Sequence, residues 1–261
     1  MNIDVDILEK LLYSVVFGLY GIVVGSFLNV LILRVPLKES ITFERSHCMS
    51  CGHTLAWYDL LPLFSFVFLG GKCRYCKEHI SFQYPLIEGL NGVLYIVLYL
   101  NKGITIVTIL YCLCSSALLA LSVIDARTRE IPVGFNIFIF ILGLIRLLTD
   151  LSHWSQYVIG FFAVSGFLFL LILVTKGKGM GGGDMKLMAA TGLLLGWKLN
   201  ILAFLLGCVL ASVIHLTMMA IKKADRYMSF GPYLSAGIYI AMIWGEQLVS
   251  WYLSMWAFKS L

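Results

Sequence analysis

Residues 104–125, ITIVTILYCLCSSALLALSVID, are a run of 21 uncharged residues followed directly by a carboxylate, Asp125. A helix of about twenty apolar residues crosses the roughly 30 Å hydrocarbon core of a bilayer. The run is therefore predicted to be a transmembrane helix that ends at Asp125. Because an ionisable group at membrane depth is costly, its presence there is by default a sign of function.

The composition extends this interpretation to the whole chain of 261 residues. It is 60% hydrophobic and 13% charged, whereas soluble proteins are about 25% charged. The mean hydropathy is +0.92, and the apolar residues form runs along nearly the whole length. These features exclude a soluble enzyme and predict an all-α polytopic membrane protein. The net charge of +5 is scattered between the runs, as in membrane loops, so we expect no nucleic-acid partner.

Charge-poor windows predict about eight transmembrane helices. Six windows are clear: 11–33, 104–124, 131–149, 157–175, 199–221 and 227–245. Two are weaker, because 84–100 contains Glu88 and the 13 residues of 185–197 rise only about 20 Å as a helix. The first window follows acidic residues rather than the basic start of a cleavable signal peptide, so we expect this helix to stay attached.

The basic residues predict the orientation of these helices. Loops that follow the first, third, fifth and seventh helices contain fourteen: Arg34, Lys38, Arg45, Lys72, Arg74, Lys77, Arg127, Arg129, Lys176, Lys178, Lys186, Lys222, Lys223 and Arg226. The opposite side has four: Lys10, Lys102, Lys198 and Lys259. Since cytoplasmic loops are enriched in Lys and Arg, the long loop 34–83 is predicted to be cytoplasmic and both termini to lie outside.

Four of the seven cysteines lie in that long polar loop as two Cys-x2-Cys pairs, Cys48 with Cys51 and Cys73 with Cys76. Each pair turns two thiolates toward one point, and four sulfurs around a tetrahedral Zn²⁺ can fold a loop that is too short for its own core. A closed four-sulfur shell leaves no open position for a reacting group. The spacing therefore predicts a structural zinc in a cytoplasmic zinc-knuckle domain.

Two alternatives remain open for these cysteines. His47, His53 and His79 flank the pairs, and any of them could replace a thiolate. The pairs could also be disulfides, although a cytoplasmic location disfavours oxidation.

A second carboxylate, Asp184, lies in the glycine-rich stretch 179–186, GMGGGDMK, on the same predicted membrane edge as Asp125. Two carboxylates that lie close together share one proton, so that one acts as a base and the other as an acid. Such a pair can deprotonate a water for attack on a peptide carbonyl and protonate the carbonyl oxygen. The glycines are predicted to let the backbone bend and approach a substrate closely.

Other readings of these residues remain. Asp125 could pair with Arg127 or Arg129, and Asp184 with Lys186, as ordinary interfacial ion pairs. A phosphate-binding loop is disfavoured, because 179–186 lacks the Gly-x4-Gly-Lys-Ser/Thr pattern and follows no strand. A zinc-knuckle adaptor would have no use for the two aspartates. A transporter would explain the intramembrane polar residues Glu88, Arg146 and His215, but the two similar halves it predicts are not seen.

The residues together resemble the bacterial type IV prepilin peptidases, members of the Gly-x-Gly-Asp membrane aspartic proteases. The resemblance covers nearly the whole chain. Its motifs are Gly25-Ser26-Phe27-Leu28-Asn29-Val30 with Arg34 and Pro36, Asp59-Leu60-Leu61-Pro62, Gly71-Lys72-Cys73-Arg74-Tyr75-Cys76, Tyr84-Pro85-Leu86-Ile87-Glu88, Ile124-Asp125 with Ile131-Pro132, residues 179–187 and Phe230-Gly231-Pro232. The chain departs from the family at Met49 and Val133, neither of which is a predicted ligand or a carboxylate.

The resemblance implies cleavage of prepilin leaders at the cytoplasmic face of the inner membrane, followed by N-methylation with S-adenosylmethionine. The substrates would be prepilins or pilin-like proteins of pilus, secretion or competence systems. Asp125 and Asp184 would be the catalytic pair, in a six-helix peptidase domain over residues 101–261. Residues 1–100 would form the methyltransferase region, in which we name Asn29, Arg34, Gly71 and Glu88 as candidate cofactor-binding residues. Helix capping and loop packing are equally good explanations for each of these four.

Overall fold

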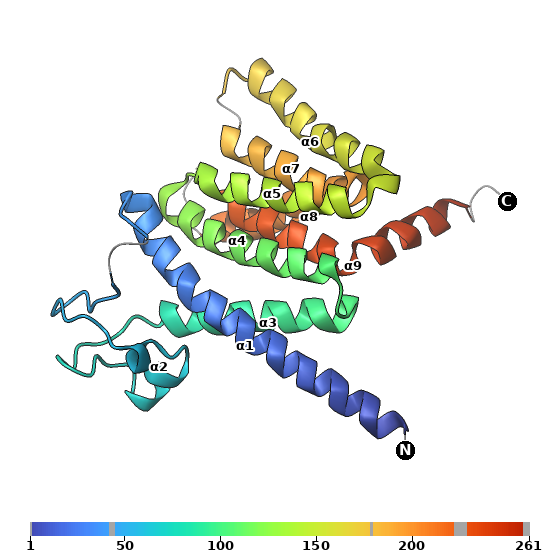
Figure 1. Ribbon diagram of the computed structural model, residues 1–261. Helices are drawn as coiled ribbons and strands as arrows, with labels where there is room; N and C mark the ends of the chain where they lie inside the picture. Colours follow the sequence, from blue (N-terminus) through green and yellow to red (C-terminus); the bar gives the residue numbers. More distant parts are fainter. Residues whose placement is uncertain (1, 42–44, 178–179, 222–228, 258–261) are drawn as a thin grey trace. The chain divides into compact units, whose positions relative to one another are not determined.

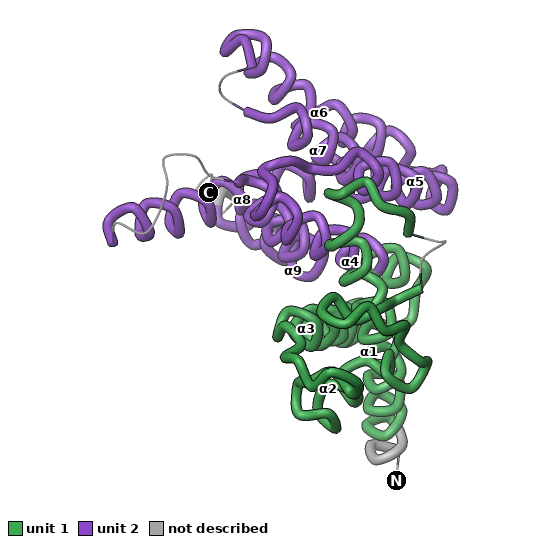
Figure 2. Tube along the Cα trace, turned by 90° about the vertical axis from the view of Figure 1, so that its left-hand side faces the viewer, with its two compact units in different colours: residues 1–112 green, residues 113–261 purple. Residues whose placement is uncertain are grey.

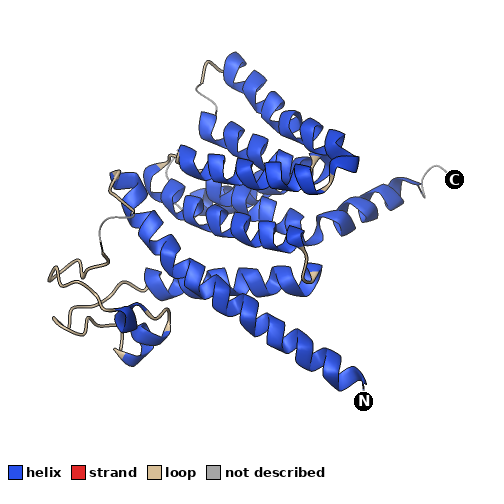
Figure 3. Cartoon of the chain, viewed as in Figure 1, coloured by secondary structure: helices blue, strands red, loops and turns tan. Residues whose placement is uncertain are grey.

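The computed structural model describes residues 2–41, 45–177, 180–221 and 229–257, and over these ranges the chain is helical and has no strand (Figures 1 and 3). The long helices are α1 (Asn2–Leu37), α3 (Gln83–Lys102), α4 (Ile106–Thr128), α5 (Val133–Thr149), α6 (Trp154–Val174), α7 (Gly182–Leu195), α8 (Trp197–Ala220) and α9 (Gly231–Ala257). The short ones are η1 (Trp57–Leu60), α2 (Phe64–Phe68) and η2 (Leu151–His153).

Each of the eight predicted windows overlaps one of the long helices. Within the described residues, four helical segments are long and apolar enough to cross a membrane: Asp6–Leu37, Ile106–Thr128, Leu151–Val174 and Trp197–Ala220. The last window was predicted to begin at Tyr227, which lies outside the described residues, and α9 begins at Gly231. Pro232 suits this position, because the first turn of a helix does not need its N–H.

The chain forms two compact units, Met1–Cys112 and Leu113–Leu261, and α4 passes from the first into the second (Figure 2). In the first unit, α1 packs against α3 with glycines at the contact. A Cβ on Gly25 would lie 2.7 Å from Cα of Glu88, and one on Gly21 would lie 2.8 Å from Cα of Gly92. Small residues allow helix backbones to approach closely where lipid provides no hydrophobic driving force.

In the second unit, α7 packs against α5, α6 and α8 (Figure 1). Most of its residues from Leu187 to Leu195 are buried. A helix that is apolar on all sides is typical of the core of a bundle. This explains how a helix of 14 residues, too short for a typical span, is accommodated: neighbouring helices cover it.

Asn200 of α8 forms hydrogen bonds with both α6 and α7. Its amide donates to the carbonyl oxygens of Met188 (3.0 Å) and Gly160 (3.3 Å) and accepts from the Thr191 hydroxyl (3.0 Å). At the same crossing, a Cβ on Gly160 would overlap the backbone of Gly192. The position of α7 therefore depends on a glycine contact and on one fully bonded amide.

We expect Gly160→Ala to lower the melting temperature of the purified protein clearly, because the added methyl must push α6 away from α7, and overpacking costs about 1–3 kcal/mol. Gly166→Ala on the same helix is the matched control, because no atom lies within 4 Å of its Cβ position. Equal melting temperatures for the two variants would contradict the close α6–α7 contact.

Candidate active site

Asp125 lies in the last turn of α4, with 5% of its surface exposed. The backbone N–H of Gly231, the first residue of α9, donates to its Oδ2 at 2.9 Å. A Cβ on residue 231 would lie 2.7 Å from the same oxygen, so only glycine allows this approach. The N-terminus of a helix carries partial positive charge and unpaired N–H groups, which suit a carboxylate.

The chain turns sharply after Asp125. Arg129 adopts a left-handed conformation (φ 59°) and donates its N–H to the carbonyl oxygen of Asp125 at 2.8 Å, which ends α4. Ile131 then packs against Gly183, where a Cβ would lie 3.0 Å from the Cβ of Ile131. This contact holds the connection between α4 and α5 beside the start of α7.

Asp184 is the third residue of α7 and is 9% exposed. The N–H of Gly181, which precedes the helix, hydrogen-bonds to its carboxylate, the arrangement of an acidic residue at this position of a capping box. The Asp125 carboxylate acts on Asp184 electrostatically. The structure thus brings the two predicted carboxylates together at the ends of their helices.

The glycine-rich stretch differs from the prediction. Gly182 and Gly183 are already helical, and Gly181 has φ −76°, which any residue can adopt. Close packing on Ile131, rather than bending, accounts for Gly183. Gly179 lies outside the described residues.

Two buried carboxylates that interact in this way share one proton. The ionised one can accept a proton from water while the protonated one donates to a carbonyl oxygen. The N–H groups of Gly231 and Gly181 fix the orientation of the two side chains. The arrangement is suited to hydrolysis of a peptide bond without a covalent intermediate.

In the first unit, the two Cys-x2-Cys pairs fold alike. Cys48 N–H donates to His53 O and Gly52 N–H to Cys48 O, and Cys73 N–H donates to Glu78 O and Lys77 N–H to Cys73 O. The fourth residue after the first cysteine has positive φ in both pairs, 70° at Gly52 and 63° at Lys77. These are two copies of one turn.

The four cysteine sulfurs lie within 4.8 Å of one another, and Cys48 Sγ lies 3.8 Å from Cys76 Sγ. Sulfurs at the corners of a tetrahedron around zinc, with bonds of about 2.3 Å, lie about 3.8 Å apart. All four cysteines are unoxidised, and none of the flanking histidines belongs to this cluster of described residues. His53 instead lies against the Tyr75 ring.

The pKa values of the thiols in the cysteine cluster also favour a bound cation. Hydrogen bonds from the backbone N–H groups of Cys51 and Ser50 lower the pKa of Cys48 to about 6. An N–H from Glu78 favours the Cys76 thiolate, but desolvation and the neighbouring sulfurs outweigh it and raise the pKa of Cys76 to about 12. Four thiolates in this space would need a compensating positive charge, which a bound zinc would supply.

Asp59 ties the second pair to η1. Burial to 3% side-chain exposure opposes its ionisation, but Arg74 donates to it at 2.7 Å and Tyr75 at 3.1 Å. With the N–H of Ala56, these donors hold the pKa of Asp59 below its usual range.

Comparison with known proteins decides the family. The bacterial peptidase A24 N-terminal domain matches residues 19–102, and the type IV leader peptidase family matches residues 112–216. A prepilin leader peptidase/N-methyltransferase of Bacillus subtilis (strain 168) is 34% identical over 93% of this chain and 98% of its own length. The chain belongs to the type IV leader peptidase family. Proteins of the same name from Pseudomonas aeruginosa and Aeromonas salmonicida are each 31% identical, over 92% and 95% of the chain and 93% and 96% of their own lengths. No solved structure matches it.

The four candidate cofactor-binding residues of this family member all lie in the first unit. Buried Asn29 donates to the carbonyl of Tyr84 at 3.2 Å, and buried Glu88 accepts from the N–H of Leu63 at 2.8 Å. Both lie where α1 meets α3. Arg34 donates to the carbonyl of Ser40. Gly71 has φ 68° and lies against the Phe66 ring, before the second cysteine pair.

Gly231 is the site residue whose role the sequence did not indicate. In the sequence, Phe230-Gly231-Pro232 is only a motif of the resemblance, with no role of its own. The sequence does contain a signal for this role. A helix that begins with Gly-Pro offers the glycine N–H at its first residue, with no side chain to keep a partner away.

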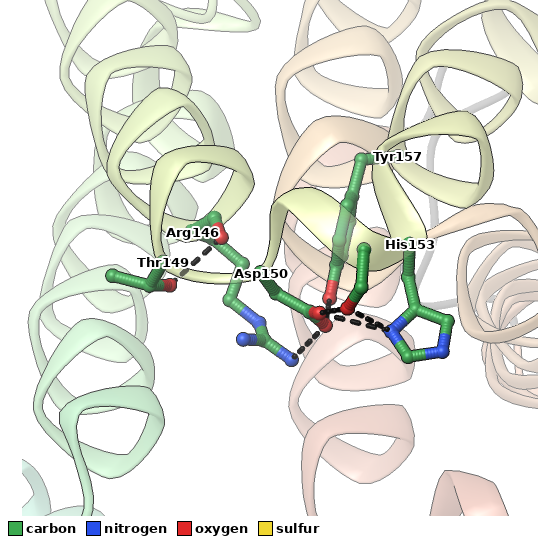
Figure 4. Close-up of polar contacts among 6 residues, drawn as sticks. Arg146, Thr149, Asp150, His153 and Tyr157 are labelled. Atoms are coloured by element: carbon green, nitrogen blue, oxygen red, sulfur yellow. Dashed lines mark hydrogen bonds and ion pairs between the residues drawn. The ribbon is translucent and has the colours of Figure 1, made fainter.

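A second polar cluster lies at the other end of α5 (Figure 4). Asp150 accepts from Ser152, His153 and Tyr157 and lies 3.5 Å from Arg146. The His153, Tyr157 and Ser152 hydrogen bonds hold the pKa of Asp150 below its usual range.

These contacts give Arg146 a local structural partner, and Glu88 has one in Leu63. The third residue of the transporter reading, His215, lines a largely apolar cavity of about 360 Å³ on α8. Arg146 and Glu88 therefore need no transport role to explain them.

Proposed function

We propose that this protein is a prepilin leader peptidase and N-methyltransferase of the bacterial inner membrane. The observation that carries the proposal is the pair of buried, interacting carboxylates Asp125 and Asp184 on helix ends. It is supported by relatives of that name that match nearly the whole chain. In the proposed reaction the pair activates water, which attacks the peptide carbonyl that follows the prepilin leader. The proton held by the pair passes to the carbonyl oxygen.

The proposed topology has eight transmembrane helices, with both termini outside. The cysteine loop and the dyad then lie at the cytoplasmic face, where a leader peptide would be met. Support comes from the fourteen-to-four distribution of Lys and Arg. The long polar loop also falls on the basic side in this arrangement.

We assign methylation to residues 1–100 and peptide cleavage to residues 101–261. The cysteine cluster would hold a structural zinc that folds loop 34–83, and S-adenosylmethionine would bind near Asn29, Arg34, Gly71 and Glu88. The bonds of Asn29 and Glu88 to backbone across the first unit show that both also support its fold.

Asp125→Asn and Asp184→Asn are each expected to lower cleavage of a synthetic prepilin more than about a thousandfold, because an amide cannot accept or share the proton. Product is measured by mass spectrometry with the purified protein in lipid. Asp150→Asn is the matched control, because it changes an aspartate of the same unit at the other end of α5. Cleavage by either dyad variant at a tenth of the wild-type rate would show that the residue is not catalytic.

Elemental analysis is expected to find one zinc per chain, and Cys48→Ser is expected to release it. Loop 34–83 should then become sensitive to added protease. The loop is too short for a hydrophobic core of its own, and the metal holds it folded instead. Cys208→Ser, outside the cluster, should retain both zinc and resistance. A wild-type protein without metal would rule out the zinc assignment.

Changes at Asn29, Arg34, Gly71 or Glu88 are expected to reduce methylation while leaving cleavage largely intact. An α-amine with a pKa near 7.7–8.0 is already partly neutral at neutral pH, so positioning should matter more than base catalysis. Asp184→Asn should methylate a pre-cleaved pilin peptide and fail on the precursor. Mass spectrometry counts the added methyl group. Equal losses of both activities in all four variants would place the methyl-transfer site elsewhere.

A further inference from the structure

Asn136, in the second turn of α5, is buried with its amide unused. It is 5% exposed, and neither its Oδ1 nor its Nδ2 has a hydrogen-bond partner in the described part of the chain. A buried amide without partners destabilises a fold, since it loses its bonds to water and gains none. Unsatisfied polar groups of this kind in native proteins often mark functional sites.

Asn136 lies on the face of α5 that meets α7. The buried residues of this helix, Phe135, Asn136, Ile139, Leu142 and Gly143, follow one helical stripe. Gly143 in this stripe contacts Leu193 of α7, with a Cβ position 3.0 Å from Cβ of that residue. The amide is therefore turned toward the helix that carries Asp184.

The register of the two helices places Asn136 beside the dyad. Gly143 of α5 contacts Leu193 of α7, an offset of 50 residues, and Ile131, two residues before α5 begins, contacts Gly183, an offset of 52, so the two helices run parallel. Asn136 is then level with residues 186–188. At 1.5 Å per residue this is roughly 3–6 Å along the axis from Asp184.

Ser235 gives an independent sign of the same site. It is 6% exposed, and its hydroxyl has no partner among the described residues. It follows Gly231 by four residues and so lies on the same face of α9, one turn further along the helix than the N–H that binds Asp125. Two unpartnered polar groups thus lie about one turn inside the level of the dyad, on different helices.

We propose that Asn136 binds the backbone of the peptide substrate next to the scissile bond, donating from Nδ2 to a carbonyl and accepting an N–H at Oδ1. This inference rests on the proposed peptidase function. A peptide bond open to attack is not part of a helix, so its neighbours have free N–H and C=O groups. At membrane depth these groups need protein partners. A primary amide is complementary to a peptide unit, since it offers one acceptor and one donor side by side.

The test measures peptide binding apart from catalysis. In the inactive Asp184→Asn protein, adding Asn136→Leu is expected to weaken binding of an uncleaved synthetic prepilin about ten- to a hundredfold. The melting temperature should stay equal or rise, because leucine has the same number of side-chain heavy atoms in the same branched arrangement and leaves no polar atom unsatisfied. Asn200→Leu is the matched control: its amide is fully bonded to Gly160, Met188 and Thr191, so this change should lower the melting temperature.

Ester-substituted prepilins identify the contact itself. Replacing one backbone N–H near the scissile bond by an ester oxygen should weaken binding to Asp184→Asn, and the same replacement should have no further effect once Asn136 is leucine. Unchanged binding in Asn136→Leu, or ester effects that persist in full at every position, would overturn the inference in favour of an amide bonded to an internal water. Cleavage by the wild-type protein separately decides the proposed function.

Discussion

The hydrogen bond from the Gly231 N–H to Asp125 joins residues 106 positions apart in the chain. It binds the last turn of α4 to the first turn of α9, so the carboxylate is held by backbone rather than by a mobile side chain. Asp184 is held in the same manner by Gly181. Both acids are thus oriented by helix termini, whose partial positive charge favours an ionised carboxylate. Each of the two interacting acids of the second unit is therefore bound to one helix N-terminus.

Close glycine contacts hold the helices of the second unit together. Gly231 leaves room for Asp125, Gly183 for Ile131, and Gly160 for Gly192. In a bilayer, helices associate through packing and hydrogen bonds rather than through the hydrophobic effect. The absence of a Cβ at a glycine therefore decides whether two backbones can touch. The same device joins α1 and α3 at Gly21 and Gly25 in the first unit.

Local signals in the sequence were sufficient for the helical elements and for the cysteine cluster. Hydropathy located all eight long helices, since each window needs only its own composition. The spacing of the cysteines predicted a cluster whose sulfurs the structure gathers within 4.8 Å. What failed depends on contacts between distant segments. The glycines of 179–183 are predicted to let the backbone bend, but Gly183 is helical and leaves room for Ile131, 52 positions earlier in the chain. The count of eight spans likewise depends on how short helices such as α7 are covered.

Buried amides in this protein normally cross-link helices. Asn29 bonds to Tyr84, Asn91 to Gly21 and Asn200 to Met188, each joining its helix to another. A buried asparagine in this fold can therefore find hydrogen-bond partners on a neighbouring helix. Asn136 differs: it lies on the face of α5 that meets α7, yet neither atom of its amide has a partner in the described part of the chain. A structural role would be met by an apolar residue of the same branched shape at less free-energy cost, which leaves a transient partner as the reason for an amide beside the dyad.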